Sequence, residues 1–215
     1  MTDIERLRDT IAGPTEQFPP VPQDEGPLHW DSIWRDLLDN PAIDPLLESL
    51  IGNPDLRHRR DRQNRTAKPT YRLDHINVHT HVAKGFEGGI LHGGWNGVSG
   101  FYRYDNGTLF NGLTTVSFEL YDTTGNDGGF ACIPGSHKAN IPAPRGWLDL
   151  SKGVHPSITR VSANAGDAII FTEALTHGTL PWHVDDPRST VFYKFSHHTL
   201  RWSADFYDRE EFVSY

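Results

Sequence analysis

Twelve histidines make metal binding or acid–base catalysis the first chemistry that this 215-residue sequence suggests. One of them, His177, ends an apolar run that starts at the turn Gly166-Asp167, and Arg188 stands eleven residues later at the head of the next apolar run. A histidine can hold a metal ion, and the planar guanidinium of an arginine can hold a carboxylate through two parallel hydrogen bonds. If both side chains point into one barrel, the pair suits a dicarboxylate cosubstrate that a metal ion binds at its other end.

A second motif makes this chemistry more specific. Residues 128–138 read GGFACIPGSHK, which resembles the signature of the phytanoyl-CoA dioxygenase (PhyH) family of non-haem Fe(II)/2-oxoglutarate-dependent enzymes. The Gly-Asp turn, the apolar run, the His-Gly pair at 177 and the arginine at 188 are similar to that family too, over residues 70–196. The resemblance implies a mainly β, double-stranded β-helix (jelly-roll, cupin-like) and an oxidoreductase that uses Fe(II), 2-oxoglutarate and O2.

The same resemblance implies roles for individual residues. His92 and His177 match the two iron-binding histidines of the family. Arg188 matches the arginine that binds the distal carboxylate of 2-oxoglutarate, and Thr179 matches a small hydroxyl residue that contacts the same carboxylate. His137, in the Pro-Gly-Ser-His turn, is not a ligand in the family, so we expect it to be structural.

The first metal motif departs from the family pattern. That motif is normally His-x-Asp/Glu, and its carboxylate completes a two-histidine-one-carboxylate face on the iron. Here the sequence is His92-Gly93-Gly94, and glycine has no ligand atom. A His-x-Gly motif resembles the radical halogenases, in which chloride fills the missing position. We therefore expect chloride at the position of Gly94, and chlorination of an unactivated C–H bond.

Two other hypotheses stay open. A hydroxylase or dioxygenase with an unusual metal shell could take its carboxylate from Glu119, on an expected inner strand, or from Glu87, or could hold water in the gap. A non-catalytic barrel is the third hypothesis. Arg188 and Thr179 weigh against it, because an inactive site has no chemical need for residues that bind a cosubstrate.

We expect the substrate to be a freestanding small molecule, because the chain leaves little length for a domain that docks a carrier protein. A nucleotide or nucleoside is one option, since Lys84, Arg103 and Lys138 could meet a phosphate. Candidate substrate contacts are polar residues that alternate along one expected strand and aromatic residues near the motifs: His75, Asn77, His79, Trp95 and Phe118.

Hydrophobic periodicity predicts the elements that must position these residues. Helical spacing between residues 30 and 51 predicts helices that end at Gly52-Asn53-Pro54. A period of two over 71–80 predicts a strand, with Tyr71, Leu73, His75, Asn77 and His79 on one face. Further strands are expected at 88–92, 113–121, 129–133, 157–161, 167–172 and 189–196. Short strands after a helical start favour a β-sandwich or barrel with the helices packed outside.

These elements divide the chain into two parts. Residues 1–27 are polar and rich in proline, and we expect an N-terminal arm there. Residues 28–215 are expected to form a single domain, with the helical start at 30–51, the β core at 56–196 and a C-terminal tail at 197–215.

Composition excludes several classes of protein. A hydrophobic fraction of 36% and an aromatic fraction of 11% can fill a core, so general disorder is excluded. The net charge of -8 argues against a nucleic-acid polymer as partner. No apolar stretch reaches the roughly 20 residues of a membrane span, and the opening residues do not resemble a secretion signal. With Cys132 as the single cysteine, we expect a cytoplasmic protein without a membrane partner; its oligomeric state is not specified.

Overall fold

The computed structural model describes residues 2–11, 27–52, 70–81, 84–93, 100–139 and 141–200. Gly94 and Trp95, on which two of the predictions rest, lie outside the described residues. Most of the expected arm and of the C-terminal tail lies outside them as well.

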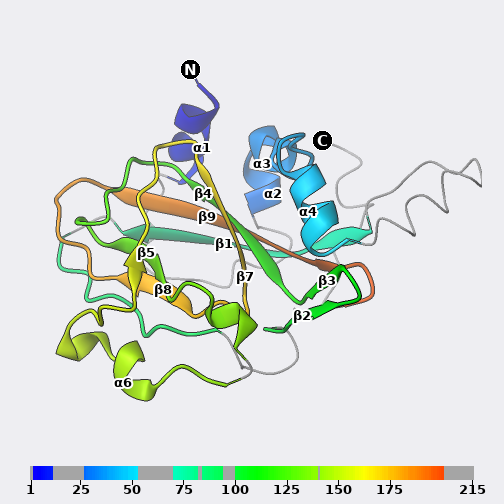
Figure 1. The fold of residues 1–215 in the computed structure, drawn as a ribbon. Helices are drawn as coiled ribbons and strands as arrows, with labels where there is room; N and C mark the ends of the chain where they lie inside the picture. Colours follow the sequence, from blue (N-terminus) through cyan, green and yellow to red (C-terminus); the bar gives the residue numbers. More distant parts are fainter. Residues whose placement is uncertain are drawn as a thin grey trace, which may run out of the picture.

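Two antiparallel sheets form the body of the molecule (Figure 1). The four-stranded sheet has the order β1-β9-β4-β7, with β1 at Tyr71–His81, β9 at Arg188–His197, β4 at Thr114–Glu119 and β7 at Ala168–Thr172. The three-stranded sheet has the order β6-β5-β8, with β6 at Thr159–Arg160, β5 at Gly129–Cys132 and β8 at His177–Leu180. A separate hairpin joins β2, Tyr102–Asp105, to β3, Thr108–Asn111. The predicted mainly β, jelly-roll class is confirmed.

Helices cover the outer face of the four-stranded sheet (Figure 1). They are α1 (Asp3–Ile11), α2 (Pro27–Trp30), α3 (Ser32–Asp36) and α4 (Asp44–Leu50). Their apolar side chains and those of the sheet bury each other in what we call the helix-side core, which includes Leu7, Trp34, Leu47, Tyr71, Phe118, Val191 and Tyr193. None of the helices in the described part of the chain has the length and apolar content to cross a membrane.

The three-stranded sheet has a smaller cover of its own. Short elements follow β5 along the chain: η2 at Ser136–Lys138, α6 at Arg145–Leu148 and η3 at Leu150–Lys152. Trp147, Leu148 and Leu150 pack against a cluster that includes Ala131 and Leu180. Each sheet therefore has its outer face covered, and its inner face turns toward the other sheet.

A third apolar cluster lies between the sheets. Phe130 comes from β5, Phe171 from β7 and Phe192 from β9. Alternation along β9 separates the two faces of the large sheet, because Val191 and Tyr193 belong to the helix-side core while Phe192 points inward. Inward-facing residues of both sheets can therefore meet at one site.

Strand β1 contains a bulge that the sequence pattern does not reveal. Its register against β9 shifts between Leu73 and His75, and an extra residue sends the following side chains to the opposite face. Tyr71 and Leu73 consequently pack in the helix-side core, whereas Asn77 and His79 line a cavity between the sheets. The expectation that all of these residues share one face is wrong.

Other boundaries also differ from the expectations. Residues 88–92 are not a strand, and their one β-type pairing is an isolated bridge between His92 and His177. Strand β8 and the β2–β3 hairpin were not expected. At the N-terminus, α1 buries Leu7 and Ile11 against the core, so the beginning of the expected arm packs on the domain.

Candidate metal centre

His92 and His177 lie side by side because two segments of backbone pair there. The backbone N–H of each residue donates to the carbonyl of the other at 2.8 Å, and the ring centroids are 4.4 Å apart. Gly93 has φ +101°, and a Cβ there would lie 2.1 Å from the carbonyl oxygen of Leu175. A side chain cannot fit in that space, so the backbone conformation and close packing at this position require glycine as the first glycine of the His-Gly-Gly motif.

Both imidazoles are in the form that binds metals. Nδ1 of His177 lies 2.7 Å from the carbonyl oxygen of Leu175, so Nδ1 donates its proton there and Nε2 keeps its lone pair. Burial lowers the pKa of His177 to about 4. Loss of solvent around His92 also lowers the pKa of that residue. Neither ring needs to lose a proton before it binds a metal ion at neutral pH.

A carboxylate completes this cluster, and it comes from Glu173 rather than from residue 94. The potential ligand atoms of His92, Glu173 and His177 all lie within 4.8 Å of one another. Oε2 of Glu173 is 3.7 Å from Nε2 of His177. Two histidines and one carboxylate are a ligand set that suits Fe(II), so the donor chemistry fits the metal that the resemblance implies.

Glu173 occupies the turn between β7 and β8, where its backbone N–H donates to the carbonyl of Leu113 at 2.9 Å. Burial opposes ionisation of its carboxyl, but the charge of Lys194 and the hydrogen bonds from Thr115 and Lys194 favour the ionised form, and the pKa lies below its ordinary value. The group is therefore an anion at neutral pH. Sequence reasoning missed Glu173, because its spacing of four residues before His177 follows no motif that we considered.

The carboxylates that the sequence suggested lie elsewhere. Glu119 is buried and accepts hydrogen bonds from Ser117 at 2.9 Å and from Thr190 at 2.7 Å. Glu87 is exposed. Neither belongs to the cluster of potential metal ligands found among the described residues.

Arg188 is buried beside Glu119, with only 1% of its surface exposed. Its Nη2 is 3.5 Å from Oε2 of Glu119, and its Nε and Nη1 are buried without a hydrogen-bond partner. A Cβ on Gly129, which has φ +81°, would lie 3.2 Å from Nε. Because a buried guanidinium with open donors requires an acceptor, these atoms fit the distal carboxylate of 2-oxoglutarate.

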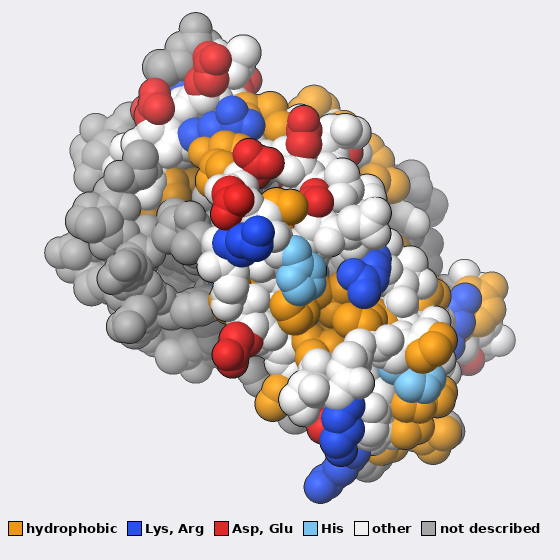
Figure 2. Space-filling view, turned by 90° about the vertical axis from the view of Figure 1, so that its left-hand side faces the viewer, with side chains coloured by type: hydrophobic (Ala, Val, Ile, Leu, Met, Phe, Trp, Pro, Cys, Tyr) orange, Lys and Arg blue, Asp and Glu red, His pale blue; other side chains and the backbone are white. Residues whose placement is uncertain are grey.

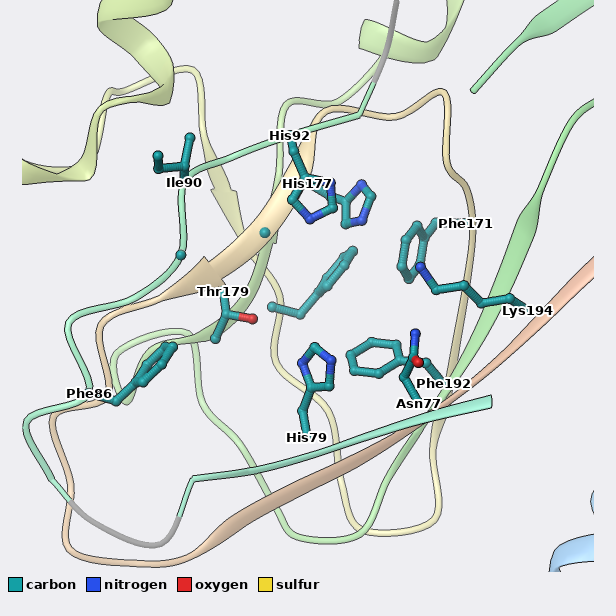
Figure 3. Close-up of a pocket in the computed structure, with 13 residues that line it drawn as sticks. Asn77, His79, Phe86, Ile90, His92, Phe171, His177, Thr179, Phe192 and Lys194 are labelled. Atoms are coloured by element: carbon teal, nitrogen blue, oxygen red, sulfur yellow. The ribbon is translucent and has the colours of Figure 1, made fainter. Parts of the chain in front are cut away.

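A cavity of about 260 Å³ lies between the sheets, and His92 and His177 are among the residues that line it. In Figure 3, His92 and His177 stand together at one end of it, and His79 and Asn77 lie across from them. Thr179 and Lys194 contribute polar atoms to the wall. Most of the remaining wall is apolar: Phe86, Ile90, Phe130, Phe171 and Phe192. Arg188 is not among the residues that line the cavity, and its Nε lies close to Gly129 of β5.

The expected substrate contacts divide into two groups. Asn77 and His79 line the cavity. His75 does not line it, and its Nδ1 lies 2.8 Å from the carboxylate of Asp74. Phe118, which was expected to contact the substrate, does not line the cavity. Alternation along β4 places its side chain in the helix-side core instead, where its ring packs on Tyr193. His137 does not line the cavity, and its ring packs edge-on against the ring of Tyr102, with 5.0 Å between the ring centroids.

Figure 2 shows one face of the molecule, on which hydrophobic side chains gather beside a histidine and basic side chains. Ile90, which lines the cavity, is 76% exposed. An exposed apolar side chain that lines the cavity favours a ligand with an apolar surface.

Comparisons with known proteins identify a family and a shared fold. The sequence pattern of a family described as "Phytanoyl-CoA dioxygenase (PhyH)" matches residues 21–190. HygX from Streptomyces hygroscopicus, solved with nickel and 2-oxoglutarate bound, is 18% identical over 93% of this chain and 79% of its own, with a TM-score of 0.71. HygX with nickel, 2-oxoglutarate and hygromycin B bound matches with a TM-score of 0.69 at 18% identity, over 93% of this chain and 80% of its own.

AviO1 from Streptomyces viridochromogenes Tue57 is also similar, at 14% identity over 94% of this chain and 87% of its own, with a TM-score of 0.57. No curated protein matches the chain in sequence. At such low identities the solved structures show a shared fold. The family match rests on the sequence itself and covers most of the chain.

Proposed function

Since the chain belongs to the phytanoyl-CoA dioxygenase family of Fe(II)/2-oxoglutarate-dependent oxidoreductases, we propose that it hydroxylates a C–H bond of a small molecule. His92, Glu173 and His177 would hold the iron. The observation that carries this proposal is the ionised carboxylate of Glu173, 3.7 Å from the free Nε2 of His177. It supplies the ligand that the His-Gly-Gly motif lacks.

Bound Fe(II) would couple the oxidative decarboxylation of 2-oxoglutarate to oxidation of the substrate. The protein's part is to bind and orient. Arg188 would donate from Nε and Nη1 to the distal carboxylate of 2-oxoglutarate, and Thr179 would donate from its hydroxyl. Phe130 and Phe171 would exclude water from the space beside the metal ligands.

The cavity supports an uncharged substrate with an apolar surface. Of the described residues that line it, Lys194 is the one Lys or Arg, and its ammonium is already 2.9 Å from Glu173. Lys84, Arg103 and Lys138, proposed from the sequence as phosphate contacts, do not line it. A nucleotide is therefore less well supported than a neutral molecule whose polar groups meet Asn77 and His79. HygX, whose structure holds hygromycin B, supports a small-molecule substrate.

Radical chlorination is the second candidate, and the His92-Gly93-Gly94 motif supports it. In that reaction chloride would take the metal position of a carboxylate, so Glu173 would remain paired with Lys194 and stay off the metal. A Gly94→Asp variant would then exclude chloride by occupancy and by like charge. The position of Glu173 favours hydroxylation instead, because an anionic oxygen already faces the metal-binding histidine.

The test combines binding with product mass. We expect anaerobic Fe(II) and 2-oxoglutarate to give a metal-to-ligand charge-transfer band with the parent protein, and the turnover product to carry oxygen both with and without chloride. Glu173→Ala should weaken Fe(II) binding strongly, and Glu87→Ala, which removes an exposed carboxylate, should not. A chlorinated product that forms only with chloride would support the second candidate. A parent that binds neither Fe(II) nor 2-oxoglutarate would support a non-catalytic barrel.

A further inference from the structure

The two oxygens of the Glu173 carboxylate have different neighbours. Oε1 accepts a hydrogen bond from the hydroxyl of Thr115 at 2.5 Å and lies 2.9 Å from Nζ of Lys194. Oε2 lies on the other side, 3.7 Å from Nε2 of His177. One oxygen is thus held by the protein, while the other faces the histidines.

The two donors that hold Oε1 come from neighbouring strands. Thr115 of β4 and Lys194 of β9 are direct partners in the register of the four-stranded sheet. The side chains of Lys194 and Glu173 are only 17% and 12% exposed, so water screens their attraction weakly. Hydrogen bonds to an ionised carboxylate are also stronger than those between neutral groups. The orientation of Glu173 is therefore fixed by the sheet rather than by the turn that carries it.

The number of carboxylate oxygens on the metal decides how many positions remain for other ligands. A carboxylate can bind a cation through one oxygen or through both. A two-histidine-one-carboxylate face functions because it leaves open positions opposite the protein ligands. A 2-oxo acid that chelates through its keto and carboxylate oxygens needs two of them, and dioxygen needs another. A glutamate that bound through both oxygens would occupy one of these positions.

We propose that Lys194, assisted by Thr115, is a positioning residue that restricts Glu173 to a single metal-binding oxygen and so keeps a coordination position open for the cosubstrate. The inference rests on the proposed function, because it takes Glu173 as the third metal ligand. It assigns Lys194 a role in the binding of the cosubstrate that acts through Glu173.

The test separates metal binding from cosubstrate binding in the full-length chain. Lys194→Met keeps much of the side-chain stem and removes the ammonium, and Lys194→Arg keeps a charged donor. Calorimetry measures the affinity of metal-free protein for Ni(II), and then the affinity of the Ni(II)-loaded protein for 2-oxoglutarate. Lys152→Met, at an exposed lysine, is the matched control. Melting temperatures establish that each variant is folded.

We expect Lys194→Met to bind Ni(II) at least as tightly as the parent, and to bind 2-oxoglutarate about tenfold or more weakly. Lys194→Arg should restore most of that affinity. Thr115→Val should also weaken the binding of 2-oxoglutarate, but by less. If Lys194→Met does not fold, the affinity of Thr115→Val for 2-oxoglutarate tests the inference. The Co(II)-loaded protein gives a second readout, because an added carboxylate oxygen changes its visible absorption spectrum.

Two results would overturn the inference. Parent-like affinity for 2-oxoglutarate in Lys194→Met would show that the ammonium does not control the open position. Loss of Ni(II) binding in that variant would show that Lys194 merely keeps Glu173 near the metal. Failure of the proposed function looks different, because the parent protein itself would then bind no Ni(II) or no 2-oxoglutarate.

Discussion

Arg188 is a buried cation whose surroundings leave its charge incompletely balanced. The only carboxylate paired with it in the described part of the chain is Glu119, at 3.5 Å, and that carboxylate already accepts hydrogen bonds from Ser117 and Thr190. Burying a charge costs free energy unless hydrogen bonds and counter-charges compensate it. Two open donors on Arg188 are therefore evidence for an anionic ligand, independent of any motif.

We predict that Arg188→Lys weakens the binding of 2-oxoglutarate although the charge is kept. An ammonium cannot reproduce two parallel N–H donors, and losing one charge-assisted hydrogen bond corresponds to about tenfold in affinity. Calorimetry on the Ni(II)-loaded protein measures the change. Arg103→Lys, at an exposed position on β2, serves as control. If Arg188→Lys binds 2-oxoglutarate as the parent does, another arginine holds the carboxylate, and Arg145, Arg160 and Arg201 are the next to test.

Glu173 marks the limit of what the sequence could reveal at the scale of single residues. The two histidines and the arginine could be predicted because their spacing resembles a known family pattern. The carboxylate could not, since its approach to His92 depends on a bridge between backbone segments 85 positions apart in sequence. An acidic residue between an apolar run and a metal-binding histidine was the available signal.

At the scale of elements, the bulge in β1 decides which side chains reach the cavity. The alternating pattern over 71–80 predicted the strand correctly, but it cannot show where one residue is skipped. Asp74 is the extra residue of the bulge, and its side chain is buried, with 1% of the residue's surface exposed. Its two carboxylate oxygens bind Arg72 and His75, each at 2.8 Å. Local side-chain pairing therefore stabilises the switch of faces between Leu73 and Asn77.

We predict that Asp74→Ala lowers the free energy of unfolding by about 2 kcal/mol, because the buried hydrogen bonds and the charge partner of Arg72 are lost. Equilibrium unfolding in urea measures the difference. Asp105→Ala removes an exposed carboxylate from the β2–β3 hairpin and should change stability little. An unfolding free energy of Asp74→Ala equal to that of the parent would show that the backbone holds the bulge without this side chain.

Short strands were the elements that the sequence predicted least well. Strand β8 has four residues and pairs with β5, which lies more than forty positions earlier. Its residues His177 and Gly178 suggest a turn when read alone. Tertiary pairing with β5 and the bridge to His92 give them their extended form, and neither contact leaves a local pattern in the sequence.

For the whole molecule, the candidate site joins the two sheets. His177 begins β8 of the three-stranded sheet, while Thr115 and Lys194 belong to the four-stranded sheet. Glu173 lies in the turn that connects them and contacts residues of both. The donor groups therefore come together only when the sheets face each other, and their protonation is linked to folding of the entire domain.

This linkage gives the metal-free protein a pH-dependent stability. Burial lowers the pKa of His177 to about 4, from an ordinary value of 6.5. Between these values the unfolded chain binds a proton at this histidine that the folded chain does not bind. Protons therefore favour the unfolded state, and stability falls as the pH decreases through this range. The pKa shift of His177 lowers the free energy of unfolding by about 3 kcal/mol at the acidic end of this range, and this loss disappears above pH 6.5.

Chelator-treated protein, unfolded in urea at several pH values between about 4.5 and 7.5, tests this prediction. Carboxylates titrate near the acidic end as well, so the informative quantity is the difference between the parent and His177→Gln at each pH. We expect the parent to lose stability relative to this variant as the pH falls below 6.5, because glutamine takes up no proton. His183→Gln, at an exposed histidine, should follow the parent. A difference between parent and His177→Gln that does not change with pH would mean that His177 titrates alike in the folded and unfolded chains, contrary to its burial beside the metal ligands.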